Sequence, residues 1–468
     1  MPSTSNSSLQ RSLKNRHIQL IALGGAIGTG LFLGVGGALG KGGPAVIISY
    51  AIGGFIAFLI MRQLGEMMTE EPVAGSFSSL AYKYWGDFPG LFSGWNYWMM
   101  YLLVSMTELT AISRFVSYWL PEIEPWQSAA FFFVFISAIN LTNVKIFGEL
   151  EFWLASIKVL AICSMIVFGI IILVGDLAPD TSSIKNLWQY GGFMPTGWKA
   201  WALSIPLVMF SYGGLEMLGI AAAETADPQK SIPKAVNQLI YRILIFYIGA
   251  VVILLTLYPW DLIVSSQSAN WVENMEASPF VLIFHKIGIL PAAHILNFVF
   301  LTAALSVYNS SIYCNSRILY GLSLQGNAPK ALGKTNSRGV PVPALLATSV
   351  PTLICVGLNY IDKDILGKLF ALVVASIVLN WCMISLTHLK FRKALKKDPK
   401  DLLFPAIFYP FSNYLCLVFM LGLFVGLWFL DEQISVMFAP VWILGFYVFY
   451  QVVLKNKRKN KKTSSQIV

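Results

Sequence analysis

The hydrophobic residues of this chain gather into long runs that are separated by short polar stretches. Apolar runs near 20 residues, the length with which an α-helix crosses a bilayer, recur from one end to the other. No sustained alternation of apolar and polar positions is present, so a membrane β-barrel is not expected. The pattern predicts an all-α polytopic membrane protein with twelve transmembrane helices, at residues 18–38, 45–65, 90–118, 126–144, 150–174, 199–221, 239–259, 290–312, 343–361, 366–388, 405–430 and 433–453.

The composition agrees with this interpretation. Only 12% of the 468 residues are charged, whereas a soluble domain carries about 25%. The N-terminus is polar and then basic, and it has no apolar core followed by a cleavage site, so no signal peptide is expected. The five cysteines are scattered and match neither a metal site nor a disulfide framework.

Positive charge is distributed unevenly between the two sets of loops. The N-terminus, the loops from even-numbered to odd-numbered spans and the C-terminus hold 25 of the 33 Lys and Arg residues. Positively charged loops stay in the cytoplasm, so the tails at 1–17 and 454–468 are both predicted to be cytoplasmic. The basic C-terminal tail is interpreted as a topology signal that contacts the membrane surface. Nucleic acid is therefore not an expected partner, despite the net charge of +10.

Two of the predicted spans are interrupted. The first contains "GGAIGTGLFLG" (24–34), and the sixth contains "LVMFSYGGLEMLGIAAAE" (207–224), which has adjacent glycines and an acid. Interrupted helices at corresponding positions of two halves indicate a transporter built from inverted repeats. The five-helix period predicts a first repeat at 18–174 and a second at 199–388, and it leaves two extra helices at 405–453.

Broken helices offer backbone groups to a ligand. Unwinding at 28–30 frees N–H groups at the positive end of a half-helix, which can bind an anion. The second break, around 210–214, frees carbonyls that can accept hydrogen bonds from a cation. Together they suit the carboxylate and ammonium groups of an amino acid. The alternative is close helix packing, because Gly24, Gly28, Gly30 and Gly34 form two small-xxx-small motifs.

Ionisable residues inside membrane spans are functional candidates. Burial disfavours the charged form of Lys158, so its amine can gain and lose a proton during a transport cycle; the alternative is a side chain that snorkels to the interface. Glu108 and Glu216 can bind substrate, relay a proton or serve as structural carboxylates. No HExxH, GxSxG or phosphate-loop motif is present, so neither an enzyme nor a cofactor or metal site is expected. The absence of a nucleotide-binding domain favours coupling to an ion gradient.

Three segments resemble the amino acid permeases of the amino acid–polyamine–organocation superfamily: "GGAIGTGLFLG", "FSYGGLEMLGIAAAETADPQKSIPKAV" and "SVYNSSIYCNSRILYGLSLQGNAPK". The resemblance implies the leucine-transporter-type fold, with a five-plus-five inverted repeat and broken helices 1 and 6, and proton-coupled uptake. It implies that Lys158 provides proton coupling. The predicted substrate-binding residues are Ala26, Ile27, Gly28, Thr29 and Gly30 in the first break, Phe210, Ser211, Gly213 and Gly214 in the second, and the acids Glu108 and Glu216.

Other segments, among them "WGDFPGLFSGWNYW", are similar to bacterial aromatic amino acid and phenylalanine permeases. We therefore expect a proton symporter of the bacterial inner membrane that imports neutral, aromatic L-amino acids by alternating access. Its expected partners are the amino acid, protons and membrane lipids. The alternatives are a permease for proline, histidine or another neutral amino acid, an amino acid exchanger, a nutrient receptor without transport, and a channel.

Overall fold

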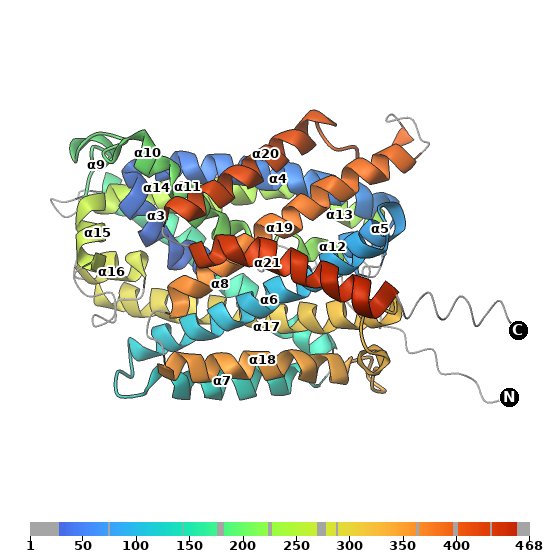
Figure 1. Cartoon of the computed structure of the whole chain (residues 1–468). Helices are drawn as coiled ribbons and strands as arrows, with labels where there is room; N and C mark the ends of the chain where they lie inside the picture. The colour runs from blue at the N-terminus through green and yellow to red at the C-terminus, as the bar shows by residue number, and fades with distance from the viewer. Residues whose placement is uncertain are drawn as a thin grey trace, which may run out of the picture.

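The structure is a computed structural model, and it is built from helices. No strand occurs in the parts of the chain that it describes. Ten helical stretches in those parts are long and apolar enough to cross a membrane, and Figure 1 shows the long helices running alongside one another. The prediction of an all-helical polytopic membrane protein is confirmed. The described residues are 28–73, 75–142, 144–175, 182–222, 227–268, 278–286, 289–361, 365–395, 401–430 and 433–455.

These ten stretches correspond to the twelve predicted spans. The first stretch, Gly34–Glu70, covers parts of two spans because the short turn η1 (Gly43–Ala45), which begins at Gly43 with φ +54°, joins their helices with no loop between them. The fourth span forms the helix α7 (Pro125–Asn140), whose 16 residues are slightly fewer than the roughly 17–25 of a full crossing. Counting both gives a helix at each predicted position, the first of which is described only from residue 28.

The first five spans form one set of helices and the next seven form another. The first set consists of α2 (Thr29–Phe32) with α3 (Gly34–Gly42), α4 (Val46–Glu70), α6 (Asp87–Ser117), α7 and α8 (Val144–Val174). The second set consists of α11 (Ser204–Met209) with η2 (Phe210–Tyr212) and α12 (Met217–Ala222), then α13 (Pro228–Arg242) with η3 (Ile243–Gly249) and α14 (Ala250–Leu257), α17 (Leu290–Leu324), α18 (Val342–Ile361), α19 (Ile365–Ala394), α20 (Phe411–Phe429) and α21 (Gln433–Phe449) with η6 (Tyr450–Lys455).

The segments between the spans contain helices that the hydrophobic pattern did not predict. Between the sixth and seventh predicted spans, α13 begins at Pro228, well before residue 239, where the seventh span is predicted to begin. A proline at the first helical position lacks only an N–H group that would have no partner there, so it begins a helix as readily as it ends one. The other helices outside the spans are α5 (Ser76–Tyr84), α9 (Asn186–Gln189), α10 (Gly197–Ala202), α15 (Trp260–Ser268), α16 (Pro279–Lys286) and η4 (Lys330–Gly333).

Helices five spans apart pack against each other. The most extensive contact in the protein joins α6 to α17, the third and eighth spans. The same relation holds for α4 with α13, for α7 with α18, and for the two interrupted spans, where α3 contacts α11. In Figure 1, α7 and α18 lie together along the lower edge. An axis of two-fold symmetry in the membrane plane brings together the counterpart helices that lie close to it, and this pattern fits an inverted repeat.

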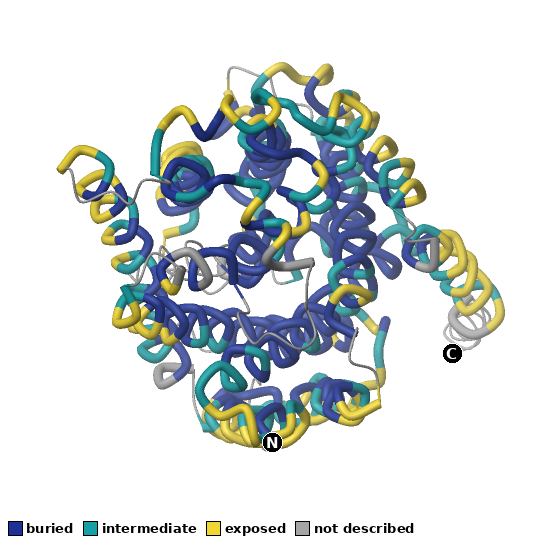
Figure 2. Tube along the Cα trace, turned by 90° about the vertical axis from the view of Figure 1, so that its left-hand side faces the viewer, coloured by how far each residue is buried: buried dark blue, intermediate teal, exposed yellow. Residues whose placement is uncertain are grey.

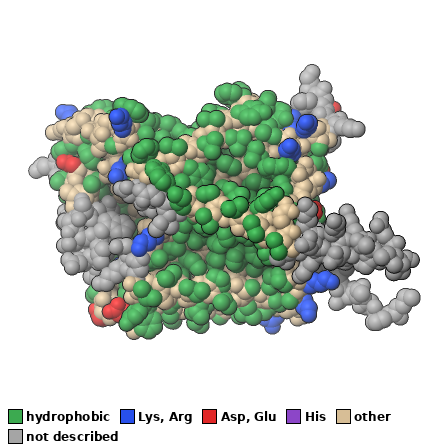
Figure 3. Space-filling model, viewed as in Figure 1, with side chains coloured by type: hydrophobic (Ala, Val, Ile, Leu, Met, Phe, Trp, Pro, Cys, Tyr) green, Lys and Arg blue, Asp and Glu red, His purple; other side chains and the backbone are tan. Residues whose placement is uncertain are grey.

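The surface is apolar between its two ends. Figure 3 shows hydrophobic side chains over most of the visible face, with Lys, Arg and acidic side chains near its left and right ends. Viewed along the helices, Figure 2 shows buried residues in the interior and exposed ones at the rim. Lipid-facing helices carry large exposed apolar side chains, such as Phe131 on α7 and Val418 on α20. Only 11% of the apolar stretch Ser435–Val452 is buried, so this last helix lies at the periphery of the bundle.

A buried ionic cluster holds α4, α19 and the chain before α20 together. The Glu66 carboxylate lies 2.5 Å from Arg392 Nε and 3.2 Å from His388 Nε2. It also accepts hydrogen bonds from Arg392 Nη2 at 2.8 Å and from the backbone N–H of Ala406 at 2.6 Å. The side chain of Glu66 is fully buried. Removing one member would leave a buried charge without its partner.

We expect Glu66→Gln to destabilise the protein by about 3–5 kcal/mol, because Arg392 would keep its charge in a site that no longer balances it. The matched control is Glu71→Gln. Glu71 pairs at 2.7 Å with Lys83, whose side chain is 56% exposed, and such a pair contributes only about 0–1 kcal/mol. Thermal unfolding of the purified proteins in detergent measures the difference, and equal melting temperatures for the two variants would contradict the prediction.

Candidate functional site

The two interrupted spans meet in the interior of the bundle. Gly28 is extended, with φ −137° and ψ −157°, and the helix α2 begins immediately after it. In the sixth span, α11 ends at Met209, the short 3-10 helix η2 ends at Tyr212, and the α-helix resumes only at Met217. Gly214 has φ +97°, a conformation that favours glycine. The first turn α2 contacts η2, so the two breaks face each other.

Glycine is required where the first break touches the second. A Cβ atom on Gly30 would lie 2.6 Å from Phe210 Cδ1 and 2.7 Å from Ser211 Cα. A Cβ atom on Gly28 would lie 2.9 Å from Val307 Cγ2. At Gly34, by contrast, no heavy atom from another part of the described chain lies within 4 Å of such a position, so close packing among these residues does not explain this glycine. The tight approach therefore belongs to Gly28 and Gly30.

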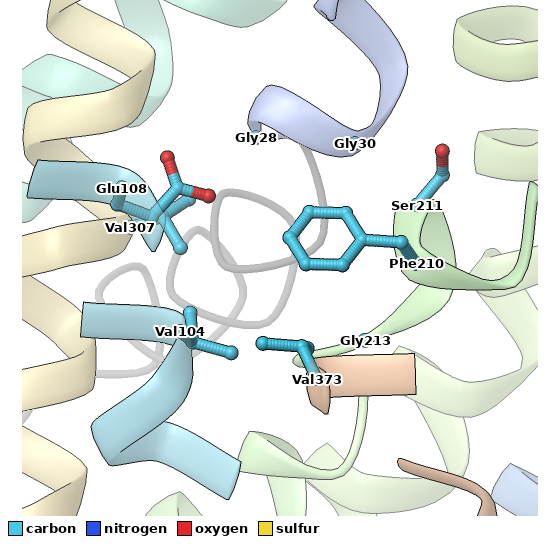
Figure 4. A pocket seen from close by; sticks show the side chains of 9 residues that line it. All are labelled: Gly28, Gly30, Val104, Glu108, Phe210, Ser211, Gly213, Val307 and Val373. Atoms are coloured by element: carbon cyan, nitrogen blue, oxygen red, sulfur yellow. The ribbon is translucent and has the colours of Figure 1, made fainter. Parts of the chain in front are cut away.

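A small cavity of about 20 Å³ lies between the two breaks. Figure 4 shows three valine side chains and the Phe210 ring directed toward it, with the Glu108 carboxylate near Gly28. The Phe210 ring also packs edge-on against Phe370, with ring centroids 4.3 Å apart. Five segments of the chain contribute the lining residues Gly28, Gly30, Val104, Glu108, Phe210, Ser211, Gly213, Val307 and Val373.

Glu108 joins the cavity to the first break. Its side chain is buried, and its Oε1 accepts a hydrogen bond from the Thr29 hydroxyl at 2.8 Å. Its other oxygen, Oε2, has no hydrogen-bond partner among the described residues. Thr29 is the first residue of α2, so the acid lies beside the end of the helix where the backbone dipole is positive. The charge of Glu108 therefore acts directly on the predicted carboxylate site.

Glu216 lies behind the second break and is not among the residues that line the cavity. Its Oε1 lies 3.3 Å from the N–H of Gly214, which donates to it, and its Oε2 accepts from Trp381 Nε1 at 3.4 Å. Its backbone carbonyl accepts from the Tyr97 hydroxyl at 2.9 Å. These contacts make Glu216 a brace for the irregular backbone of the sixth span.

Carbonyls in the second break already accept hydrogen bonds from the protein. The Ser211 carbonyl accepts from the Tyr247 hydroxyl at 2.9 Å, and the Phe210 carbonyl accepts from the N–H of Gly213 at 3.1 Å. A carbonyl oxygen has two lone pairs, so each can still accept a second bond. These carbonyls are the groups that the sequence predicts for an ammonium site.

Lys158 is buried in α8 and does not snorkel to the interface. Its Nζ donates a hydrogen bond to Ser306 Oγ of α17 at 2.8 Å. Two carboxylates, Glu108 and Glu151, lie near enough to interact with its charge. The amine therefore belongs to a buried polar cluster that reaches the first break through Glu108 and Thr29.

The structure brings together most of the predicted site residues and adds others. Ala26 and Ile27 lie outside the described residues. Val104 stands one helical turn before Glu108 and was detectable from that spacing, since residues four apart share a helix face. The sequence carries no comparable signal for Val307 and Val373, which come from α17 and α19. The acid Glu151 was also missed, because it stands at the start of its predicted span.

The first span, whose described helix begins after Gly28, and the interrupted sixth span face each other across a small cavity within a bundle of apolar helices, which is the arrangement of a membrane transporter. The chain belongs to the amino acid permease family, whose model matches residues 17–463. It is 56% identical over 457 residues to the aromatic amino acid transport protein AroP of Salmonella typhimurium strain SL1344, covering 97% of each chain. It is 54% identical over 444 residues to AroP of Escherichia coli strain K12, covering 94% of this chain and 95% of that one. It is also 40% identical over 448 residues to the uncharacterized transporter YdgF of Bacillus subtilis strain 168, covering 95% and 96%.

Proposed function

We propose that this protein imports aromatic L-amino acids together with protons across the inner membrane of a bacterium, with both of its termini in the cytoplasm. The observation that carries the proposal is the cavity between the two breaks, which combines backbone polar groups with an apolar wall. The 56% identity to a transporter named for aromatic amino acids supports this substrate class. Alternating access would expose the cavity to each side of the membrane in turn.

The backbone of the two breaks would hold the groups common to all amino acids. The N–H groups of the first turn after Gly28 lie at the positive end of the half-helix, and they would donate hydrogen bonds to the substrate carboxylate. The carbonyls around Ser211 and Gly213 would accept hydrogen bonds from the ammonium group. Because these contacts involve no variable side chain of the substrate, they would select for an amino acid but not for a particular one.

The apolar wall would select the side chain of the substrate. Val104, Val307 and Val373 face the cavity, and the Phe210 ring lies among them (Figure 4). Glu108 is the one charged residue in this lining. A neutral aromatic ring can stack or pack edge-on against Phe210, whereas a lysine side chain would bury a charge against valines.

Proton coupling would act through Glu108 and Lys158. An ionised Glu108 repels a second carboxylate at the same helix end, and its protonation removes that repulsion. Lys158 interacts with this acid and is hydrogen-bonded to α17. It would exchange the proton with Glu108 as the first half-helix moves. Binding of the proton then raises the affinity for the substrate, and binding of the substrate raises the affinity for the proton, which is what symport requires.

A competition assay tests the substrate class. With purified protein in proteoliposomes, we expect phenylalanine, tyrosine and tryptophan to inhibit uptake of labelled phenylalanine at concentrations at least about tenfold lower than proline or lysine. Empty liposomes provide the background. An acidic outer compartment should drive accumulation without amino acid inside. Inhibition strongest by proline would overturn the substrate assignment, and uptake that requires internal amino acid would indicate exchange instead of symport.

A further inference from the structure

A second buried acid lies on the same helix as Lys158. Glu151 precedes Lys158 by seven residues on α8, which is two helical turns, so both side chains project from the same face. The start of α8 follows a loop that the charge distribution predicts to be cytoplasmic. Glu151 therefore lies between Lys158 and the cytoplasmic end of the helix, and its side chain is fully buried.

One hydroxyl group connects the two residues. Lys158 Nζ donates to Ser306 Oγ at 2.8 Å, and Ser306 Oγ donates to Glu151 Oε1 at 2.5 Å. The three groups form a continuous hydrogen-bonded chain from an amine to a carboxylate. A hydroxyl in such a chain can accept a proton on one side while it donates its own on the other.

Among the described residues, the surroundings of Glu151 are polar and supply no second cation. The charged group that acts on it is Lys158, and α17 adds Asn309 and Ser310 next to its carboxylate. From α7, Asn140 donates to Asn309 at 2.8 Å. The helix α14, which packs on α8, has no charged residue. The Asn309 and Ser310 side chains are within reach of the Glu151 carboxylate, and its Oε1 is the oxygen that accepts from Ser306.

Charge balance requires that one carboxyl of this cluster be protonated. Glu108 and Glu151 are two acids, and Lys158 is the one amine that interacts with both. If all three were ionised, the cluster would carry an unbalanced negative charge in the membrane interior, which is costly. A cluster without net charge would hold one proton, on Glu108 or on Glu151.

We propose that Glu151 is a proton-relay residue of the transport cycle, which receives a proton from Lys158 through the Ser306 hydroxyl and passes it toward the cytoplasm. The inference rests on the proposed function, since it assumes that transport is coupled to protons. In the transfer, a Lys158 N–H bond breaks as an O–H bond forms on Ser306. The original Ser306 O–H bond breaks as a new one forms on Glu151 Oε1. Lys158 becomes a neutral amine, Glu151 becomes a neutral acid, and no electrons are transferred.

An aromatic pair lies on the cytoplasmic side of this relay. Phe147, one turn before Glu151 on α8, stacks on Tyr313 of α17 with ring centroids 4.1 Å apart and an interplanar angle of 3°. The Arg317 guanidinium lies 3.7 Å over the Tyr313 ring. This pair separates the relay from the helix end, so the proton would leave Glu151 when the rings part.

The test compares proton-driven accumulation with substrate counterflow, which exchanges labelled for unlabelled amino acid without net proton movement. In proteoliposomes, we expect Glu151→Gln to reduce accumulation under an acidic outer compartment at least about tenfold and to leave counterflow within about twofold. Ser306→Ala, which keeps both titratable groups and removes the hydroxyl, should behave in the same way. The matched control Glu149→Gln makes the same change two residues earlier, at a half-buried position, and should alter neither activity.

The outcomes separate the relay from a structural role and from the proposed function. Wild-type accumulation in Glu151→Gln, or equal losses of accumulation and counterflow in both variants, would overturn the relay. If Glu151→Gln does not reconstitute, Ser306→Ala decides by the same two criteria. A wild-type protein that shows counterflow but no proton-driven accumulation would overturn the proposed function, and the relay with it. If the wild type shows proton-driven accumulation and a variant keeps it, the relay proposal is overturned and the proposed function is not.

Discussion

Lys158→Ala is expected to abolish accumulation driven by a proton gradient, with a loss of at least about tenfold, while substrate exchange persists. The amine is buried, it donates to Ser306 at 2.8 Å, and it lies near two acids. Without it, the proton has no route between the first break and the rest of the buried cluster. Uptake in proteoliposomes with an acidic outer compartment measures the accumulation, and counterflow measures the exchange.

A second substitution separates the charge of Lys158 from its ability to release a proton. Lys158→Arg keeps a positive charge, but a guanidinium does not deprotonate in a protein. We therefore expect it to lose coupling as Lys158→Ala does. Lys185→Ala, at an exposed loop position, is the control and should transport normally. Accumulation with an unchanged pH dependence in Lys158→Ala would remove this residue from the mechanism.

Gly30→Ala is expected to weaken substrate binding about 10–100-fold, because its added Cβ atom would lie 2.6–2.7 Å from Phe210 and the Ser211 backbone. The backbone atom cannot rotate away as a flexible side chain would, so the two broken helices must move apart. That movement enlarges the distance between the carboxylate and ammonium sites. Binding of labelled phenylalanine to the purified variant measures the effect.

The same helix supplies a matched control for this prediction. Gly34→Ala adds the same methyl group four residues later, where no heavy atom lies within 4 Å. Alanine also favours a helix over glycine, so we expect normal affinity and unchanged stability. Similar losses in the two variants would show that the close contact at Gly30 does not determine binding, and a normal affinity in Gly30→Ala would contradict the proposed role of the first break.

Much of the fold was predictable because the bilayer imposes a simple rule on sequence. A helix that crosses lipid needs an uninterrupted apolar run, so α18 (Val342–Ile361) differs from its predicted span by one residue at its start. Where helices continue beyond the lipid, the rule gives no signal. The prediction for the eighth span ends at residue 312, whereas α17 continues to Leu324 because its last turns are buried against other parts of the protein.

The candidate site was predictable in part, for a related reason. Unwound helices need glycine, and therefore the clusters at 28–30 and 213–214 stand out in any apolar run. The partners of Glu216 and Lys158 were not predictable, because Trp381 and Ser306 lie more than a hundred residues away in sequence. Only the packing of the helices shows that Glu216 braces the break and that Lys158 is not a snorkelling side chain.

The sequence by itself determined the spans, the positions of the two breaks and the chemistry that they offer, because hydrophobic run length and glycine content act locally. Only the tertiary structure decided which residues form the cavity wall, which acid faces it, and that Glu151 joins Lys158 through Ser306. Those relations depend on contacts between helices, and helix packing is set by the shapes of many side chains at once. These contacts between helices cannot be predicted from any single stretch of the sequence.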